Sequence, residues 1–256
     1  MASNVIGFKH PAIKCCECLW RENCIAADVS EMRGGALDSE AWPRKAFKSG
    51  ASIHVQGQLI DHVSILRAGS AKAVVGDDSG AEQIVAFLFP GDLLGAVAMG
   101  GGGVSSSIIT LEQAAVCRVP YRVFNDPHPT LWSNMMRAIA RQERAVGRHL
   151  LSIGQHSAHE RFAYFLLNLS ARYASCGLAP DEFNLPMSRQ DIANYLGLAV
   201  ETVSRLFGEL DAMGLIAVER RFVRLPSLAD LEAYAAGEPM ENAHANDLNQ
   251  VSGQRI

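Results

Sequence analysis

Four cysteines stand close together near the start of the chain, at positions 15, 16, 18 and 24. Thiols this close usually serve one soft metal ion or cluster that needs several thiolates at once. If Cys15, Cys18 and Cys24 are ligands, their spacing is C-x2-C-x5-C, and a fourth ligand must come from elsewhere. Cys117 is the candidate, and Cys16 could replace its neighbour Cys15. The cysteines therefore predict a metal site built from four thiolates.

The identity of the metal is left open by the spacing, because zinc and iron–sulfur clusters both accept four cysteine thiolates. The sixth cysteine, Cys176, lies in a polar connection with no thiol near it in sequence, and we expect it to bind no metal. Clustered cysteines more often bind metal than form disulfides in the cytoplasm, where thiols stay reduced. We expect a cytoplasmic protein, because no run near the start fits a signal peptide and none is long enough to span a bilayer.

The composition is that of a soluble globular protein, with 48% hydrophobic and 20% charged residues among 256. This length suggests about two domains. The longest apolar runs fall far short of the ~18–20 residues that span a bilayer, and no run near the start fits a signal peptide. No membrane association is therefore expected. The net charge of −4 does not by itself indicate a nucleic-acid partner.

Short β-prone runs separated by glycines fill the region 46–128. Many short strands at near-regular spacing are typical of a small antiparallel roll or barrel. We therefore predict a β-roll (jelly-roll) sensory domain here, preceded by an N-terminal cysteine segment at 1–45. The predicted strands are 52–55, 63–66, 71–75, 83–88, 108–111 and 114–119.

The pattern changes to helix after Pro129. Apolar residues recur at spacings of three and four over about three heptads, which is the pattern of a coiled-coil seam. A helix that packs only on its own barrel is the other interpretation, but the regular seam flanked by arginines favours a two-chain coiled coil. We predict a dimerisation helix at 129–156 and a homodimer. The seam positions are Trp132, Met136, Ile139, Glu143, Val146, Leu150 and Ile153.

A helix-turn-helix follows within 157–231. Ser188 suits a helix N-cap, Gly197 suits the left-handed turn, and Val203 suits the buried face of the second helix. Residues 214–225 alternate as a two-stranded wing would, with Arg220, Arg221 and Arg224 near phosphates. Arginines and acidic residues balance at five each between 188 and 224, so a positive face needs a particular arrangement. The alternative is a helical hairpin that has only a packing role and does not bind DNA.

The second helix of this motif carries Glu201, Ser204 and Arg205 on its leading face. Arginine can bond bidentately to guanine, and a carboxylate can accept from cytosine N4. The polar, aperiodic residues of 232–256 are expected to form a disordered tail. The predicted fold class is α+β: an N-terminal β-roll, a long dimerisation helix and a C-terminal winged helix-turn-helix.

This order of segments resembles the FNR branch of the CRP/FNR family of bacterial transcription regulators, over residues ~12 to ~230. The motifs that carry the resemblance are the cysteine spacing 15-18-24, Cys117 within 116–120, the turn 90–93, and the two stretches 187–198 and 200–206.

The resemblance implies an oxygen-labile [4Fe-4S] cluster, held by Cys15, Cys18, Cys24 and Cys117, that is present in the dimeric DNA-binding form. It also implies that Glu201, Ser204 and Arg205 read a TTGAT-type half-site of an inverted repeat, with Arg189 and Arg221 among the DNA-binding residues. RNA polymerase would be the protein partner of such an activator.

Glu143 is the one charged residue of the predicted seam. Two carboxylates brought together across a twofold axis raise each other's pKa and oppose association. In the family that this chain resembles, an acidic residue in this helix keeps the cluster-free protein monomeric. Here Val146 occupies the place where that charge usually falls, so this chain departs from the pattern.

Other functions are disfavoured by what the sequence lacks. A buried cyclic nucleotide phosphate needs a cation, but no Arg or Lys lies between Asp92 and Val116. A haem sensor is disfavoured because His54 and His62, the histidines of the roll, sit in polar, turn-flanking settings. No recognisable catalytic constellation suggests an enzyme, and an iron–sulfur electron carrier would not need a helix-turn-helix.

Overall fold

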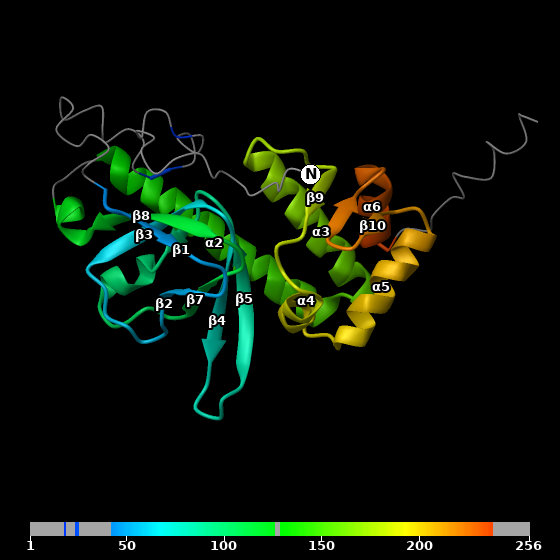
Figure 1. Cartoon of the computed structure of the whole chain (residues 1–256), viewed down its shortest axis with the longest axis horizontal. Coiled ribbons are helices and arrows are strands. Elements are labelled where there is room, and N and C mark those ends of the chain that lie inside the picture. The colour runs from blue at the N-terminus through cyan, green and yellow to red at the C-terminus, as the bar shows by residue number, and fades with distance from the viewer. Residues whose placement is uncertain (1–17, 19–23, 26–41, 126–128, 238–256) are drawn as a thin grey trace, which may run out of the picture. The chain divides into compact units, whose positions relative to one another are not determined.

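The computed structural model describes residues 18, 24–25, 42–125 and 129–237 (Figure 1). They fall into two compact units. The first comprises the chain up to Gly154 together with Asn184–Val200, and the second comprises Gln155–Phe183 with the chain from Glu201 onward. No helix in the described part of the chain is both long and apolar enough to cross a membrane.

The first unit is built on two four-stranded antiparallel sheets. One has the order β1-β8-β3-β6, with β1 Arg44–Phe47, β8 Ala114–Pro120, β3 His62–Ala68 and β6 Leu93–Leu94. The other has the order β2-β7-β4-β5, with β2 Ser52–His54, β7 Ser107–Thr110, β4 Ala71–Gly76 and β5 Glu82–Leu88. Residues of both sheets, including Leu66, Val116, Ala73 and Ile108, are buried in one apolar core.

A left-handed glycine makes the tight connection between β3 and β4. Gly69 has φ +77°, and a Cβ there would lie 2.3 Å from the carbonyl oxygen of Gln113. Any other residue would be strained by its backbone conformation and would also collide with the neighbouring main chain. This supports the role of glycines as strand separators in the sequence.

The long helix α2, Pro129–Gln155, begins and ends within one residue of its predicted bounds. Leu131, Met135 and Ala138 form its buried stripe, at the spacing of one helical face. They join a second apolar cluster with Val63 and Val119 of the roll. Gln142 adds a polar contact, because its Nε2 donates to the carbonyl of Leu93 at 2.9 Å.

The second unit contains the helices α3 Ala158–Ser175, α5 Val200–Ala212 and α6 Leu228–Ala235. The small sheet has the order β10-β11-β9, with β10 Ala217–Glu219, β11 Phe222–Arg224 and β9 Glu182–Asn184. The rings of Phe162 and Phe207 meet edge to face at 4.5 Å between centroids and join α3 to α5. A capping box of Ser157 and Glu160 starts α3.

Most predicted elements are confirmed. The differences are three short strands and the last helix. All six predicted strands of the roll are present, with ends shifted by up to two residues. Strands β1, β6 and β9 were not predicted from the sequence. The expectation of a disordered tail from residue 232 is wrong for 232–235, which form the second half of α6 and contribute the buried Ala235. Residues 238–256 lie outside the described part.

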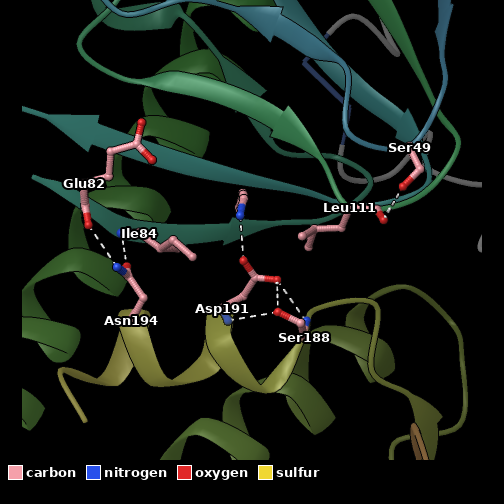
Figure 2. A network of polar contacts seen from close by, with 8 residues as sticks. Ser49, Glu82, Ile84, Leu111, Ser188, Asp191 and Asn194 are labelled. Atoms are coloured by element: carbon pink, nitrogen blue, oxygen red, sulfur yellow. Dashed lines mark hydrogen bonds and ion pairs between the residues drawn. The ribbon is translucent and has the colours of Figure 1, made fainter. Parts of the chain in front are cut away.

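Helix α4, Arg189–Leu196, belongs to the first unit and packs against the edge strand β5. The side-chain amide of Asn194 accepts from Ile84 N at 2.6 Å and donates to Glu82 O at 2.9 Å, as Figure 2 shows. It thus satisfies two main-chain groups on the open edge of the sheet. Lys72 of β4 adds an ion pair to Asp191 at 2.6 Å.

We expect Asn194→Ala to destabilise the first unit by about 1–3 kcal/mol, because the partly buried N–H of Ile84 loses its acceptor. Urea unfolding of the variant measures this loss. Asn168→Ala is the control, since Asn168 is exposed and bonds within its own helix to Tyr164 O. We expect that variant to stay within about 0.5 kcal/mol of the parent. Equal losses in the two variants would contradict this role for Asn194.

Candidate DNA interface, cysteine site and helix seam

The helix-turn-helix elements are present at the predicted positions. Ser188 caps α4, and its hydroxyl accepts from Asp191 N while the Asp191 carboxylate accepts from Ser188 N. Gly197 ends α4 in the left-handed conformation with φ 64°. Helix α5 then begins at Val200. The local chemistry of one cap and one glycine therefore sets where α4 starts and stops and leaves room for α5 to begin.

The predicted base-reading residues share one exposed face of α5. Glu201, Ser204 and Arg205 are exposed, whereas Val203 and Leu206 are fully buried on the opposite face. Spacings of three and four residues place the exposed side chains next to one another. This arrangement presents a carboxylate, a hydroxyl and a guanidinium together, which is a set that can bond to base edges.

The wing is a two-stranded ribbon whose turn is made by Arg220 and Arg221. Arg220 has φ +56°, which is uncommon for a residue with a side chain. Arg221 is exposed. The guanidinium of Arg224 lies 3.6 Å from the Glu182 carboxylate, so its charge is partly compensated. Arg221 is therefore better placed than Arg224 to contact a phosphate.

Arg189, another predicted DNA contact, is half-buried at the start of α4. Burial lowers the pKa of its guanidinium to about 10. The structure thus gives Arg189 a different environment from the exposed Arg205, and a phosphate contact there stays a prediction.

The predicted cluster ligands lie partly inside the described residues. Cys15 and Cys16 lie outside them, whereas Cys18, Cys24 and Cys117 are described and half-buried. Cys24 and Cys117 pack against the same apolar cluster, although they are far apart in sequence. Within the described ranges, no three His, Cys, Asp or Glu side chains are grouped closely enough to hold a metal ion.

Helix α2 presents two different faces. The predicted seam is exposed at Met136, Val146 and Leu150, with 57%, 46% and 64% of their surfaces accessible. Glu143 is exposed beside them, and Ile139 is half-buried. The buried stripe of α2 and the seam meet at Ile139, which packs against the apolar cluster that contains the stripe. An apolar row left open on a helix that is already packed favours the two-chain interpretation.

The prediction that His54 lies in a polar, turn-flanking setting is wrong. Its side chain is buried in β2, with Nε2 3.2 Å from the Ser64 hydroxyl. Burial, and then repulsion from His62 and Arg118, lower its pKa to about 4. His54 is therefore neutral at pH 7 and belongs to the interior of the roll.

Two further residues next to the predicted DNA interface were missed from the sequence. Glu209 lies four residues after Arg205, and its Oε1 is 3.3 Å from Arg205 Nε. Its other oxygen is 2.9 Å from Nε2 of His159 on α3. The spacing of Arg205 and Glu209 could have indicated the first contact. The second depends on the tertiary fold.

Comparisons with known proteins agree with this architecture. The family model of the Crp-like helix-turn-helix domain matches residues 160–234, and that of the cyclic nucleotide-binding domain matches residues 44–126. FixK2 from Bradyrhizobium japonicum shares the fold with a TM-score of 0.68 at 24% identity, covering 78% of this chain and 98% of that one. A CRP-family transcriptional regulator from Thermus thermophilus gives a TM-score of 0.62 at 25% identity, covering 78% and 100%.

Relatives of known identity match over most of the chain. The fumarate nitrate reduction regulatory protein of Klebsiella oxytoca is 34% identical over 230 residues, which are 89% of this chain and 92% of that protein. The fumarate and nitrate reduction regulatory protein of Escherichia coli K12 is 34% identical, covering 84% and 87%. These proteins are regulators, and the chain carries the same kind of DNA-binding domain, so it is a transcription regulator and not an enzyme. The chain belongs to the FNR branch of the CRP/FNR family of bacterial transcription regulators.

Proposed function

We propose that this regulator responds to oxygen through a [4Fe-4S] cluster that controls its dimerisation and its binding to a TTGAT-type inverted repeat. The ligands would be Cys18, Cys24, Cys117 and either Cys15 or Cys16. In this proposal the partners are DNA, a second copy of the chain and RNA polymerase. The observation that carries the proposal is a shared contact, because Cys24, Cys117 and the dimerisation helix touch the same apolar cluster.

The cysteines found in the described residues suit such a cluster chemically. Iron–sulfur clusters are held by cysteine thiolates, and Cys24 and Cys117 are half-buried beside apolar side chains that limit the access of water. Such a cluster, when bound, would supply iron–sulfur bonds that are sensitive to oxygen. The chain's own contribution is to bring Cys24 and strand β8 to one place beside α2.

The cysteines and α2 are connected through one apolar cluster. Ile25 follows Cys24 directly and is buried in the same cluster as Leu131 and Met135 of α2. Restraint on Cys24 therefore also restrains Ile25 within this packing. Loss of the restraint would weaken the support of α2, whose other face is the open seam, and two copies would pair less well.

The match to a cyclic nucleotide-binding domain describes the shared roll, and we do not propose a nucleotide ligand. No Arg or Lys lies between Asp92 and Val116, a stretch that includes β6 and β7. A phosphate buried beside this stretch would find no cation from it. A structural zinc site is the second candidate for the cysteines, because zinc accepts the same four thiolates.

Single replacement of Cys18, Cys24 or Cys117 by Ser should abolish iron and sulfide incorporation under anaerobic conditions, because each removes one of four required thiolates. Metal and sulfide analysis of the purified variants measures this. Cys176→Ser is the matched control and should retain the full content. Cys15 and Cys16 need replacement both singly and together. Full cluster occupancy in Cys117→Ser would disprove the fourth ligand, and zinc without sulfide in the parent would favour the second candidate.

Arg205→Ala should weaken binding to the specific site by about 1–3 kcal/mol and relax the preference at one base pair, as expected for an arginine bidentate to guanine. Arg221→Ala should instead weaken binding to all sequences alike and reduce the slope of its salt dependence by about one. Titrations with single-base-pair variants of the site at several salt concentrations separate these effects. An equal loss on specific and random duplexes for Arg205→Ala would show that α5 does not read bases through this residue.

Glu143→Leu should give a dimer that binds DNA in air without its cluster, because the variant removes the carboxylate that meets its own copy in the seam. Sedimentation of the cluster-free proteins in air gives the monomer–dimer constants. Ala145→Leu adds the same side chain at an exposed position outside the seam and is the control. Identical constants for the parent and Glu143→Leu would show that Glu143 is only a solvated residue.

A further inference from the structure

Glu209 joins two side chains through the two oxygens of one carboxylate. Oε1 lies 3.3 Å from Nε of Arg205, one turn earlier on α5. Oε2 lies 2.9 Å from Nε2 of His159 on α3. The three residues belong to the second unit, and the packing of Phe162 against Phe207 holds the two helices together beside them.

We propose that Glu209 is a positioning residue that sets the base specificity of Arg205. The inference rests on the proposed function, in which Arg205 reads a base. Glu209 does not touch DNA in this account. It acts by restricting the guanidinium to the orientation in which base recognition is possible.

The contact with Glu209 leaves Nη1 and Nη2 of Arg205 available for a base. Glu209 engages Nε, whereas a bidentate bond to O6 and N7 of guanine needs two N–H groups on one edge of the guanidinium, and Nη1 and Nη2 supply such an edge. Arg205 has 67% of its side-chain surface exposed, so without a tether it would sample many rotamers. Immobilising such a side chain on binding costs about 0.5–1.5 kcal/mol, and a tether formed before binding reduces that cost.

Glu209 is itself held in place. Its side chain is 34% exposed, half as much as that of Arg205, and His159 bonds the oxygen that Arg205 does not use. The ring of Tyr234 on α6 lies edge-on to His159 at 6.4 Å between centroids. Burial, and then the nearby Glu209 carboxylate, raise the pKa of Tyr234.

If Glu209 acted only through its charge, its removal would strengthen DNA binding, whereas a positioning role predicts weaker binding to the specific site. A carboxylate close to DNA repels phosphates, so its loss should strengthen binding to every sequence through a general electrostatic effect. Loss of positioning should weaken binding to the specific site only. The two explanations therefore differ in sign, and the specific and random duplexes together distinguish them.

The test compares Glu209→Ala with Glu209→Gln in the full-length anaerobic protein. Dissociation constants are measured for a TTGAT-type inverted repeat, for the same repeat with single-base-pair changes, and for a random duplex. Glu209→Ala should lose about threefold to tenfold affinity for the specific site and none for the random duplex. Glu209→Gln removes the same charge but keeps an oxygen acceptor, so it should lose less. Equal effects of the two variants would overturn the proposal.

Two further variants test whether the effect of Glu209 acts through its contacts with His159 and Arg205. His159→Ala should loosen Glu209 and reduce discrimination in the same direction but by less. In an Arg205→Ala background, Glu209→Ala should change discrimination no further, because the residue that it positions is gone. Thermal unfolding of each variant identifies a general structural loss, which would weaken binding to both duplexes alike and would overturn the proposal.

The proposal and the proposed function fail in different ways. If Arg205→Ala itself leaves base preference unchanged, base reading by Arg205 is wrong. If Arg205→Ala relaxes the preference but Glu209→Ala does not, base reading stands and the positioning role of Glu209 is wrong.

Discussion

The packing of helix α2 on the β-roll is the constraint on which the rest of this account depends. Leu131, Met135 and Ala138 fill one apolar cluster with Val63 and Val119, and this fixes which face of the helix points inward. A helix whose inward face is fixed presents a defined outer face. That outer face is apolar and exposed at Met136, Val146 and Leu150. In our proposal, the packing that attaches the helix to its own roll also leaves this face open for a second copy.

The same apolar cluster brings two of the cysteines together with α2. Cys24 and Cys117 lie against it from distant parts of the sequence, and Ile25 is buried within it. In our proposal, a change at the cysteines reaches α2 through this shared apolar cluster. This connection explains, in the same proposal, how an effector bound by thiolates could alter dimerisation.

Much of the fold could be predicted from local patterns, since glycine-separated runs indicated six strands and the seam indicated α2. Strands β1, β6 and β9 have two to four residues each and were missed, whereas the equally short β10 and β11 were predicted together from the alternation over 214–225. His54 was misplaced because its burial depends on packing between distant strands. The contacts of Asn194 with β5 join residues more than a hundred positions apart, which no local pattern reveals. At the DNA interface, residue types and helix faces were predictable, whereas the link from Glu209 to His159 was not.

The central claim is that cluster state and dimerisation change together. The most direct measurement is the absorption spectrum of anaerobically purified protein, followed by sedimentation of the same sample before and after exposure to air. We expect iron and sulfide with visible absorption in a dimer at first, then loss of that absorption together with conversion to monomer. A protein that contains zinc without sulfide, or that stays dimeric in air while its cluster is lost, would contradict the account.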